Sequence, residues 1–141
     1  MIDESAGSRT LFLDANVLIS AAWREGCEIA QIWQMTGVRL VTSNYVMGEV
    51  QRNLPRVDQI ERLRKLMRSV QLLTFDLLPE IAEVALPLKD LPVLAGAVQV
   101  KADFLVTGDK KHFGPLFGSI VCGVRIIAPT ELLSALRTGG R

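Results

Sequence analysis

Four acidic side chains stand where strands or helices are expected to begin or end, and they are Asp14, Glu49, Asp90 and Asp109. We call these four residues the acidic quartet. Carboxylates that gather without Cys or His partners bind hard divalent cations, and such cations promote the attack of water on phosphodiesters. The quartet therefore predicts a metal-binding carboxylate cluster with hydrolytic chemistry.

The spacing of apolar residues predicts strands that alternate with helices along the chain. Strands that alternate with helices favour an α/β fold with a mostly parallel sheet and helices on both faces. The expected strands are 10–13, 38–42, 70–75, 104–107 and 121–127, and the expected helices are 17–22, 28–35, 44–54, 57–67, 79–86, 91–101 and 130–136.

These elements place the quartet at one edge of the sheet, beyond the carboxyl ends of the strands, where ligands bind in open α/β sheets. Asp14 directly follows the first strand, and Glu49 lies within about two turns of the start of the helix after the second strand. The helix after Asp90 leads the chain roughly 16 Å away from this edge, and the next strand leads it back by about 17 Å. Asp109 is therefore expected to return to the level of Asp90.

Each acid also has a purely structural interpretation. Asp90 could cap a helix, Asp109 could belong to an ordinary turn, and Glu49 could be a solvated helix residue. Asp14 is harder to explain in this way, because it ends an apolar strand and precedes the apolar run 17–19, where a charge needs a reason. Taken together, the four convergent acids favour a functional site.

Electrostatic repulsion indicates what such a site must hold. Two carboxylates about 5 Å apart repel by roughly 3 kcal/mol at an effective dielectric constant of 20. Without a cation, some of the acids would stay protonated. Oxygen ligands favour Mg²⁺ or Mn²⁺ over zinc. His112, the single histidine, is interpreted as a loop residue near the rim of the site, in preference to the alternative that it is a metal ligand.

Two polar residues and three lysines flank the quartet. Asn16 and Thr107 are predicted to hydrogen-bond a ligand carboxylate or a water beside it, although a helix cap and a strand preference explain them equally well. Lys89, Lys110 and Lys111 are predicted to bind backbone phosphates of a substrate, with a solvated face as the alternative. A second basic group is expected to be mostly a solvated face, or else a nucleic-acid or partner surface: Arg52, Arg56, Arg62, Arg64, Lys65 and Arg68.

Composition fits one compact domain over residues 1–141, with loose tails at about 1–8 and 138–141. The net charge is +1, but if the quartet is set apart, the other 11 acids face 16 Lys and Arg residues, an excess of five positive charges. Neither a membrane span nor a signal peptide is recognisable, so a cytoplasmic location is expected. Cys27 and Cys122 are interpreted as reduced core cysteines.

Three segments together resemble the PIN-domain nucleases, especially the small single-domain VapC-like toxins of type II toxin–antitoxin pairs. The resemblance spans residues 10–137, and its combined pattern is quite specific although each part alone is weak. The segments are LFLDANVLISA (Leu11 to Ala21), SNYVMGEVQRNL around Glu49, and KDLPVLAGAVQVKADFLVTGDKKHF (Lys89 to Phe113).

The resemblance implies a three-layer α/β/α domain with a central parallel sheet, for which the spacing of apolar residues predicts five strands. It also implies dependence on Mg²⁺ or Mn²⁺ and single-stranded RNA as the substrate. The quartet matches the family's acidic positions one for one, and Asn16 and Thr107 match its usual polar companions. Asp103 falls on a frequently acidic position, but it precedes its strand, and we interpret it as structural. Many members form homodimers and are held inactive by a small antitoxin.

The sequence hypothesis is thus a metal-dependent endoribonuclease, with the quartet as metal ligands and catalytic residues. One alternative is an aspartyl-phosphate phosphatase, but these enzymes usually need a second Asp two residues after the first, where this chain has Asn16. The other alternative is an RNA- or partner-binding module without catalysis, in which the acids only cap helices.

Overall fold

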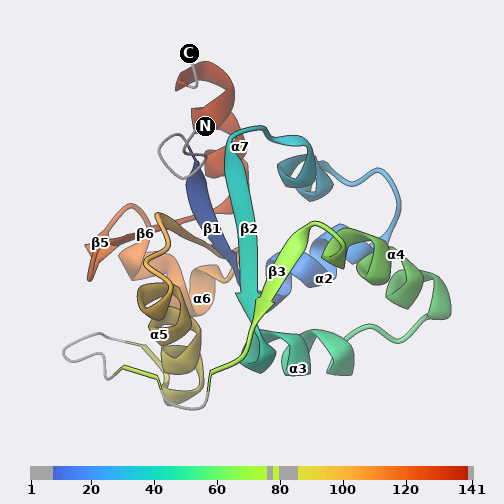
Figure 1. Ribbon diagram of the computed structural model, residues 1–141, viewed down its shortest axis with the longest axis horizontal. Helices are drawn as coiled ribbons and strands as arrows, with labels where there is room; N and C mark the ends of the chain where they lie inside the picture. The colour runs from blue at the N-terminus through green and yellow to red at the C-terminus, as the bar shows by residue number, and fades with distance from the viewer. Residues whose placement is uncertain (1–7, 76–77, 80–85, 140–141) are drawn as a thin grey trace, which may run out of the picture.

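A central six-stranded sheet organises the molecule in the computed structural model, which describes residues 8–75, 78–79 and 86–139 (Figure 1). The strand order is β3-β2-β1-β4-β6-β5, and every neighbouring pair is parallel except β5 and β6. The strands are β1 (Arg9–Leu13), β2 (Val38–Ser43), β3 (Val70–Leu73), β4 (Phe104–Val106), β5 (Ile120–Val121) and β6 (Val124–Ile127). The α/β class and the mostly parallel sheet agree with the sequence prediction.

The expected count of five strands is wrong, because the predicted strand over 121–127 is a tight hairpin. Cys122 and Gly123 form its two-residue turn, with φ of 49° and 86°. Positive φ at both positions is the signature of a type I′ turn, which joins two twisted antiparallel strands. Cys122 is consequently exposed, and Cys27 is half-buried. The prediction that both are core cysteines is therefore wrong.

Helices flank the sheet, as expected. The α-helices are α2 (Ala15–Trp23), α3 (Asn44–Arg52), α4 (Val57–Met67), α5 (Leu91–Gln99), α6 (Lys110–Phe113) and α7 (Pro129–Gly139). The 3-10 helices are η1 (Glu28–Gln34), η2 (Leu88–Asp90) and η3 (Gly114–Leu116). The predicted helix over 28–35 is therefore a 3-10 helix, and the short helices α6 and η3 were not predicted.

Packing distributes these helices around the strands. Helix α2 packs against α3, α4 and η1, whereas α5 packs against β2 and β4, and Figure 1 shows α4 and α5 on different sides of the strands. Within the described part of the chain, no helix is long and apolar enough to cross a membrane. Most of the predicted helix over 79–86 and most of the predicted tail 1–8 lie outside the described residues. Half of the predicted tail 138–141 lies outside them as well, and residues 138–139 end α7.

The central strand β1 contributes buried residues to the core and ends at the site. Leu11, Phe12 and Leu13 are completely buried, as a parallel strand covered on both faces requires. Leu13 pairs with Val106 of β4, and the backbone N–H of Asp14 donates to the Val106 carbonyl at 3.0 Å. The two parallel strands therefore end side by side, and the polar residues after them share one edge of the sheet.

Helix α5 is brought close to β1 at Gly96. A Cβ atom at this position would lie 3.1 Å from Cζ of Phe12, a completely buried side chain that has little room to move. Gly48 on α3 is different, because its nearest contact would be the end of the flexible Arg52 side chain at 3.4 Å.

Gly48→Ala is therefore expected to stabilise the protein by about 0.5–1 kcal/mol, the usual gain for a helical glycine. Gly96→Ala is expected to lose this gain and to lower the free energy of unfolding, because Phe12 must shift. Chemical denaturation measures both changes. Equal stabilisation by the two substitutions would contradict this description of the contact between α5 and β1.

Candidate active site

The acidic quartet lines one pocket of about 280 Å³ at the carboxyl edge of the sheet. The carboxylates come from four different places in the chain: the end of β1, the middle of α3, the junction of η2 with α5, and the loop after β4. The edge argument made from the sequence therefore gives the observed placement, including that of Glu49. The other residues that line the pocket are Asn16, Tyr45, Arg52 and Lys89.

Asp14 is the most enclosed member of the quartet, with 5% of its surface exposed. Its Oδ1 accepts a hydrogen bond from the backbone N–H of Ala15 at 2.7 Å, which caps α2. Its Oδ2 accepts from the Thr107 hydroxyl at 2.8 Å and from Nδ2 of Asn16 at 3.3 Å. These bonds fix the orientation of the carboxylate.

Asn16 and Thr107 join the ends of β1 and β4 into one network. Oδ1 of Asn16 accepts from the backbone N–H of Gly108 at 2.6 Å, and its Nδ2 donates to the Thr107 hydroxyl at 3.2 Å. The same hydroxyl accepts from the backbone N–H of Asp109 at 3.1 Å. Both side chains thus position members of the quartet, in contrast with the helix-cap and strand-preference explanations.

Burial makes the charge of Asp14 costly. The pKa of Asp14 is raised from 3.8 to about 6, and desolvation is the largest cause. The hydrogen bonds from Thr107 and Ala15 oppose this rise, whereas the nearby charges of Glu49 and Asp90 contribute to it. Desolvation also raises the pKa of Asp90, with Asp109 contributing in the same direction and His112 and Lys89 opposing it. The acids therefore lie close enough to repel one another.

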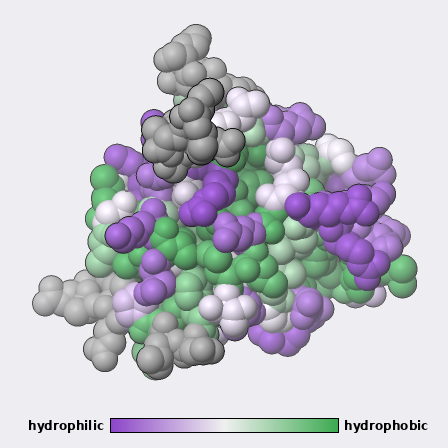
Figure 2. Space-filling view, in the orientation of Figure 1, coloured by the Kyte–Doolittle hydropathy of each residue, from purple (hydrophilic) through white to green (hydrophobic). Residues whose placement is uncertain are grey.

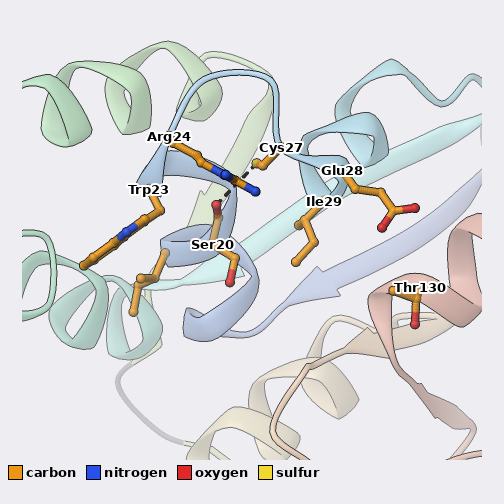
Figure 3. Close-up of a pocket in the computed structure, with 8 residues that line it drawn as sticks. Ser20, Trp23, Arg24, Cys27, Glu28, Ile29 and Thr130 are labelled. Atoms are coloured by element: carbon orange, nitrogen blue, oxygen red, sulfur yellow. Dashed lines mark hydrogen bonds between the residues drawn. The ribbon is translucent and has the colours of Figure 1, made fainter.

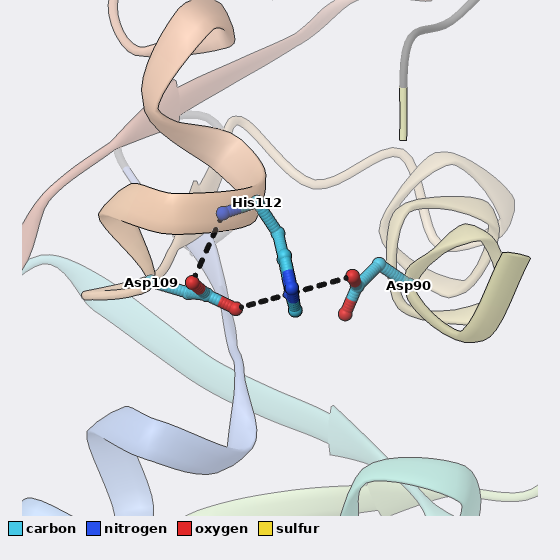
Figure 4. Close-up of side chains that lie close together, drawn as sticks. All are labelled: Asp90, Asp109 and His112. Atoms are coloured by element: carbon cyan, nitrogen blue, oxygen red, sulfur yellow. Dashed lines mark hydrogen bonds and ion pairs between the residues drawn. The ribbon is translucent and has the colours of Figure 1, made fainter. Parts of the chain in front are cut away.

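Asp90, Asp109 and His112 form the other end of the site (Figure 4). Nδ1 of His112 lies 3.0 Å from Oδ2 of Asp90 and 2.9 Å from Oδ2 of Asp109. His112 belongs to α6, so its interpretation as a loop residue is wrong. Its expected position beside the site agrees with the structure, because it contacts two of the acids without lining the pocket. Asp90 makes no capping hydrogen bond with its side chain, whereas Asp109 caps α6 by accepting from the backbone N–H of His112 at 3.1 Å.

The donor set fits a divalent cation. Oδ2 of Asp90 and Nδ1 of His112 are buried and have no directed hydrogen-bond partner, and such atoms are costly unless something else satisfies them. One ligand atom from each of Asp90, Asp109 and His112 can be chosen so that all three lie within 4.8 Å of one another. Asp14 and Glu49 line the same pocket as Asp90 and Asp109, and His112 lies behind these two acids and does not line it. That the quartet binds metal remains a prediction, but its geometry is compatible with one.

The basic residues divide into those at the pocket and those away from it. Of the three predicted lysines, Lys89 lines the pocket, whereas Lys110 and Lys111 are exposed on α6 and do not line it. Tyr45 and Arg52 line the pocket but were not predicted to do so. They precede and follow Glu49 by four and three residues on α3, and this spacing, which places residues on one helix face, could have identified them.

The other charged residues have structural roles or lie on the solvated surface. Asp103 is structural, because its Oδ2 accepts from the backbone N–H of Thr10 at 2.7 Å, at the opposite end of the strands. The expected solvated face of α4 is confirmed, and its basic residues form ion pairs with neighbouring acids. Arg56 and Arg62 pair with Asp58, and Arg64 pairs with Glu61. Figure 2 shows hydrophilic side chains on this side of the molecule.

A larger pocket, of about 380 Å³, lies between α2, η1 and the start of α7 (Figure 3). Trp23 and Ile29 contribute apolar surface, and Glu28 is the one acid that lines it. The Cys27 thiol donates to the Ser20 carbonyl oxygen at 3.3 Å. This pocket therefore does not offer the cluster of carboxylates that distinguishes the site at the sheet edge.

Comparisons with known proteins agree with this geometry. Residues 10–111 match the family model of the PIN domain, and the chain belongs to the PIN-domain family. The expected resemblance to PIN-domain proteins is therefore confirmed.

The fold is also found among solved structures. A chain in the crystal structure of VapBC2 from Rickettsia felis, bound to a DNA fragment from their promoter, superposes with a TM-score of 0.62 at 13% identity. The match covers 84% of this chain and 98% of that chain. At this identity the similarity establishes the fold, which is α/β with a mostly parallel sheet between helices. A search of curated proteins finds no significant match.

The raised pKa of Asp14 predicts how metal-free protein responds to pH. A carboxyl group whose pKa is higher in the folded state stabilises the protein fully below its unfolded pKa, and this contribution is lost as pH rises through the folded value. In EDTA, stability is therefore expected to fall between about pH 4 and pH 6. The shift from 3.8 to about 6 corresponds to roughly 3 kcal/mol.

Asp14→Asn removes the titrating group, so its free energy of unfolding is expected to vary less with pH over this window. Urea denaturation at a series of pH values in EDTA compares the variant with the wild type, and Glu61→Gln, on the exposed face of α4, provides the control. If the Asn variant and the wild type had the same pH dependence, the claim that burial raises the pKa of Asp14 would be wrong.

Proposed function

We propose that this protein is a metal-dependent endoribonuclease that hydrolyses phosphodiester bonds in single-stranded or loop RNA. The observation that carries the proposal is the convergence of four acids, from four separate parts of a PIN-domain chain, on one pocket. Nucleases are general in this family, and the chain retains every acidic position of the quartet.

In this proposal, the quartet holds one or two Mg²⁺ or Mn²⁺ ions. Such an ion supplies a lowered pKa for the attacking water and charge stabilisation for the departing oxygen. The residues of the chain do the positioning. Thr107 and Asn16 hold the carboxylate of Asp14 in one orientation, and burial keeps water from competing for it.

The basic and aromatic residues of the pocket suit a nucleic acid. Arg52 and Lys89 line the pocket beside the acids and would bind the phosphates on either side of the scissile bond. Lys110 and Lys111 are exposed nearby and would bind phosphates farther along the strand. This arrangement places cations around the rim of an acidic centre, which attracts a polyanion while the metal ions compensate the acids.

Tyr45 supports a single-stranded substrate. Its side chain is 42% exposed, and its hydroxyl donates to the Lys89 backbone carbonyl at 2.8 Å, which fixes the ring at the pocket. Exposed aromatic rings stack on unpaired bases, and such bases are available in single strands and loops but not inside a duplex.

The biological role that we propose is that of a toxin in a toxin–antitoxin pair, acting on RNA in the cytoplasm. PIN-domain membership and the fold shared with a chain of the VapBC2 structure support this role. A small antitoxin is the proposed partner, and a homodimer is the proposed assembly. The phosphatase alternative is disfavoured, because Asn16 uses its side chain to join Gly108, Thr107 and Asp14 and provides no second carboxylate.

Cleavage is the direct test of this function. Untagged protein incubated with a mixture of structured and unstructured RNAs is expected to cut them with Mn²⁺ or Mg²⁺ and not with EDTA. Asp14→Asn is expected to lower the rate by at least about a hundredfold, because it removes a charge from the metal-binding set. Glu61→Gln, which removes the same charge from the distant α4, should cut like the wild type.

Failure of the wild type to cut any RNA or DNA with either metal would overturn the nuclease proposal. In that case, retained RNA binding would support the binding-module alternative. Equal rates for Asp14→Asn and Glu61→Gln would point instead to a contaminating nuclease.

Phosphate contacts at the rim predict a specific salt dependence of RNA binding. The affinity of Asp14→Asn protein for a short single-stranded RNA is expected to fall linearly with salt on logarithmic axes. Adding Arg52→Ala or Lys89→Ala should reduce the slope by about 0.7, the value for one phosphate contact on a single strand. Arg64→Ala, whose guanidinium pairs with Glu61 on α4, should leave the slope unchanged. Equal slopes for all variants would exclude these rim contacts.

A further inference from the structure

His112 is held in a fixed position by its own short element. Asp109 accepts from the backbone N–H of His112 at 3.1 Å, and Phe113, the next residue, is completely buried. The cap at one side and the buried ring at the other fix the turn of α6 that carries the imidazole. The side chain of His112 is 20% exposed and lies between the two carboxylates in Figure 4.

The contacts of this imidazole are close but not those of a hydrogen bond. Nδ1 lies 3.0 Å from Asp90 Oδ2 and 2.9 Å from Asp109 Oδ2, yet neither Nδ1 nor Asp90 Oδ2 has a partner with hydrogen-bond geometry. Buried polar atoms that face one another without directed bonds are costly. A shared cation would satisfy all three atoms at once, because a nitrogen lone pair and two carboxylate oxygens are all ligands.

We propose that His112 is a nitrogen ligand of the metal centre, beside Asp90 and Asp109, and that it makes this centre prefer transition-metal ions such as Mn²⁺ over Mg²⁺. The proposal rests on the proposed function for the existence of a metal centre. It goes beyond an all-oxygen site, which was the expectation from the acidic quartet alone.

The preference follows from ligand chemistry. Mg²⁺ is a hard ion that requires oxygen ligands in near-ideal octahedral geometry and gives up its waters reluctantly. First-row transition ions accept imidazole nitrogen readily. The carboxylates of Asp14 and Glu49 remain available to either class of ion, so the imidazole is what distinguishes the two metals at this site.

The sequence permits an unusually clean spectroscopic test, because His112 is the only histidine among 141 residues. Untagged protein loaded with Mn²⁺ is examined by electron spin echo envelope modulation, once with natural nitrogen and once with ¹⁵N-labelled histidine. The proposal expects ¹⁴N modulation that changes to the ¹⁵N pattern on labelling. Bound Mn²⁺ without any histidine modulation would overturn this inference and leave the proposed function standing.

Metal affinities provide the second readout. His112→Gln is expected to weaken Mn²⁺ binding by roughly tenfold or more in calorimetry, while Mg²⁺ binding changes much less, so that the preference for Mn²⁺ shrinks. Glu61→Gln should keep both affinities. Equal losses for the two metals would show that His112 only balances charge, and this would overturn the inference.

The two proposals can fail separately. If wild-type protein binds no Mn²⁺ at millimolar concentration, both the metal-dependent function and the role of His112 are wrong. The spectroscopic test uses the wild type itself, so a folding defect in His112→Gln would not prevent a decision.

Discussion

The burial of one carboxylate, Asp14, beside other acids is the physical constraint on which this site depends. Asp14 is 5% exposed at the end of the central strand, and its pKa is raised to about 6 by burial and by the charges of Glu49 and Asp90. A protein stable by only about 5–15 kcal/mol cannot gather such charges without compensation. The hydrogen bonds from Thr107 and Ala15 compensate part of this cost, and a cation would compensate the rest.

The parallel sheet brings the acidic side chains together at one edge. Parallel pairing brings the carboxyl ends of β1 and β4 to one edge, and Asn16 links the two ends by accepting from Gly108 and donating to Thr107. The close contact of Gly96 with Phe12 holds α5 against β1, and acids that are far apart in the sequence meet at this edge. Such preorganisation would suit the metal-dependent hydrolysis that we propose, because fixed groups need not reorganise during the reaction.

Elements with a regular spacing of apolar residues could be predicted from the sequence. Features that depend on a few local contacts, such as a turn conformation or a side-chain orientation, could not. The buried strand before Asp14 and the amphipathic helix α4 were predictable, and helix and strand lengths placed the quartet on one edge. The turn at Cys122 was hidden within an apolar run, since positive φ at a cysteine has no sequence signal. The orientation of His112 depends on a four-residue helix that hydrophobic spacing could not reveal.

The central claim is that the folded quartet requires a divalent cation, and metal-linked thermal stability measures this most directly. At pH 7.5, Mn²⁺ at about a hundred times its dissociation constant is expected to stabilise the wild type by roughly 2.7 kcal/mol. Asp14→Asn should lose most of this gain, and Glu61→Gln should keep it. No stabilisation of the wild type, or equal stabilisation of all three proteins, would contradict the account.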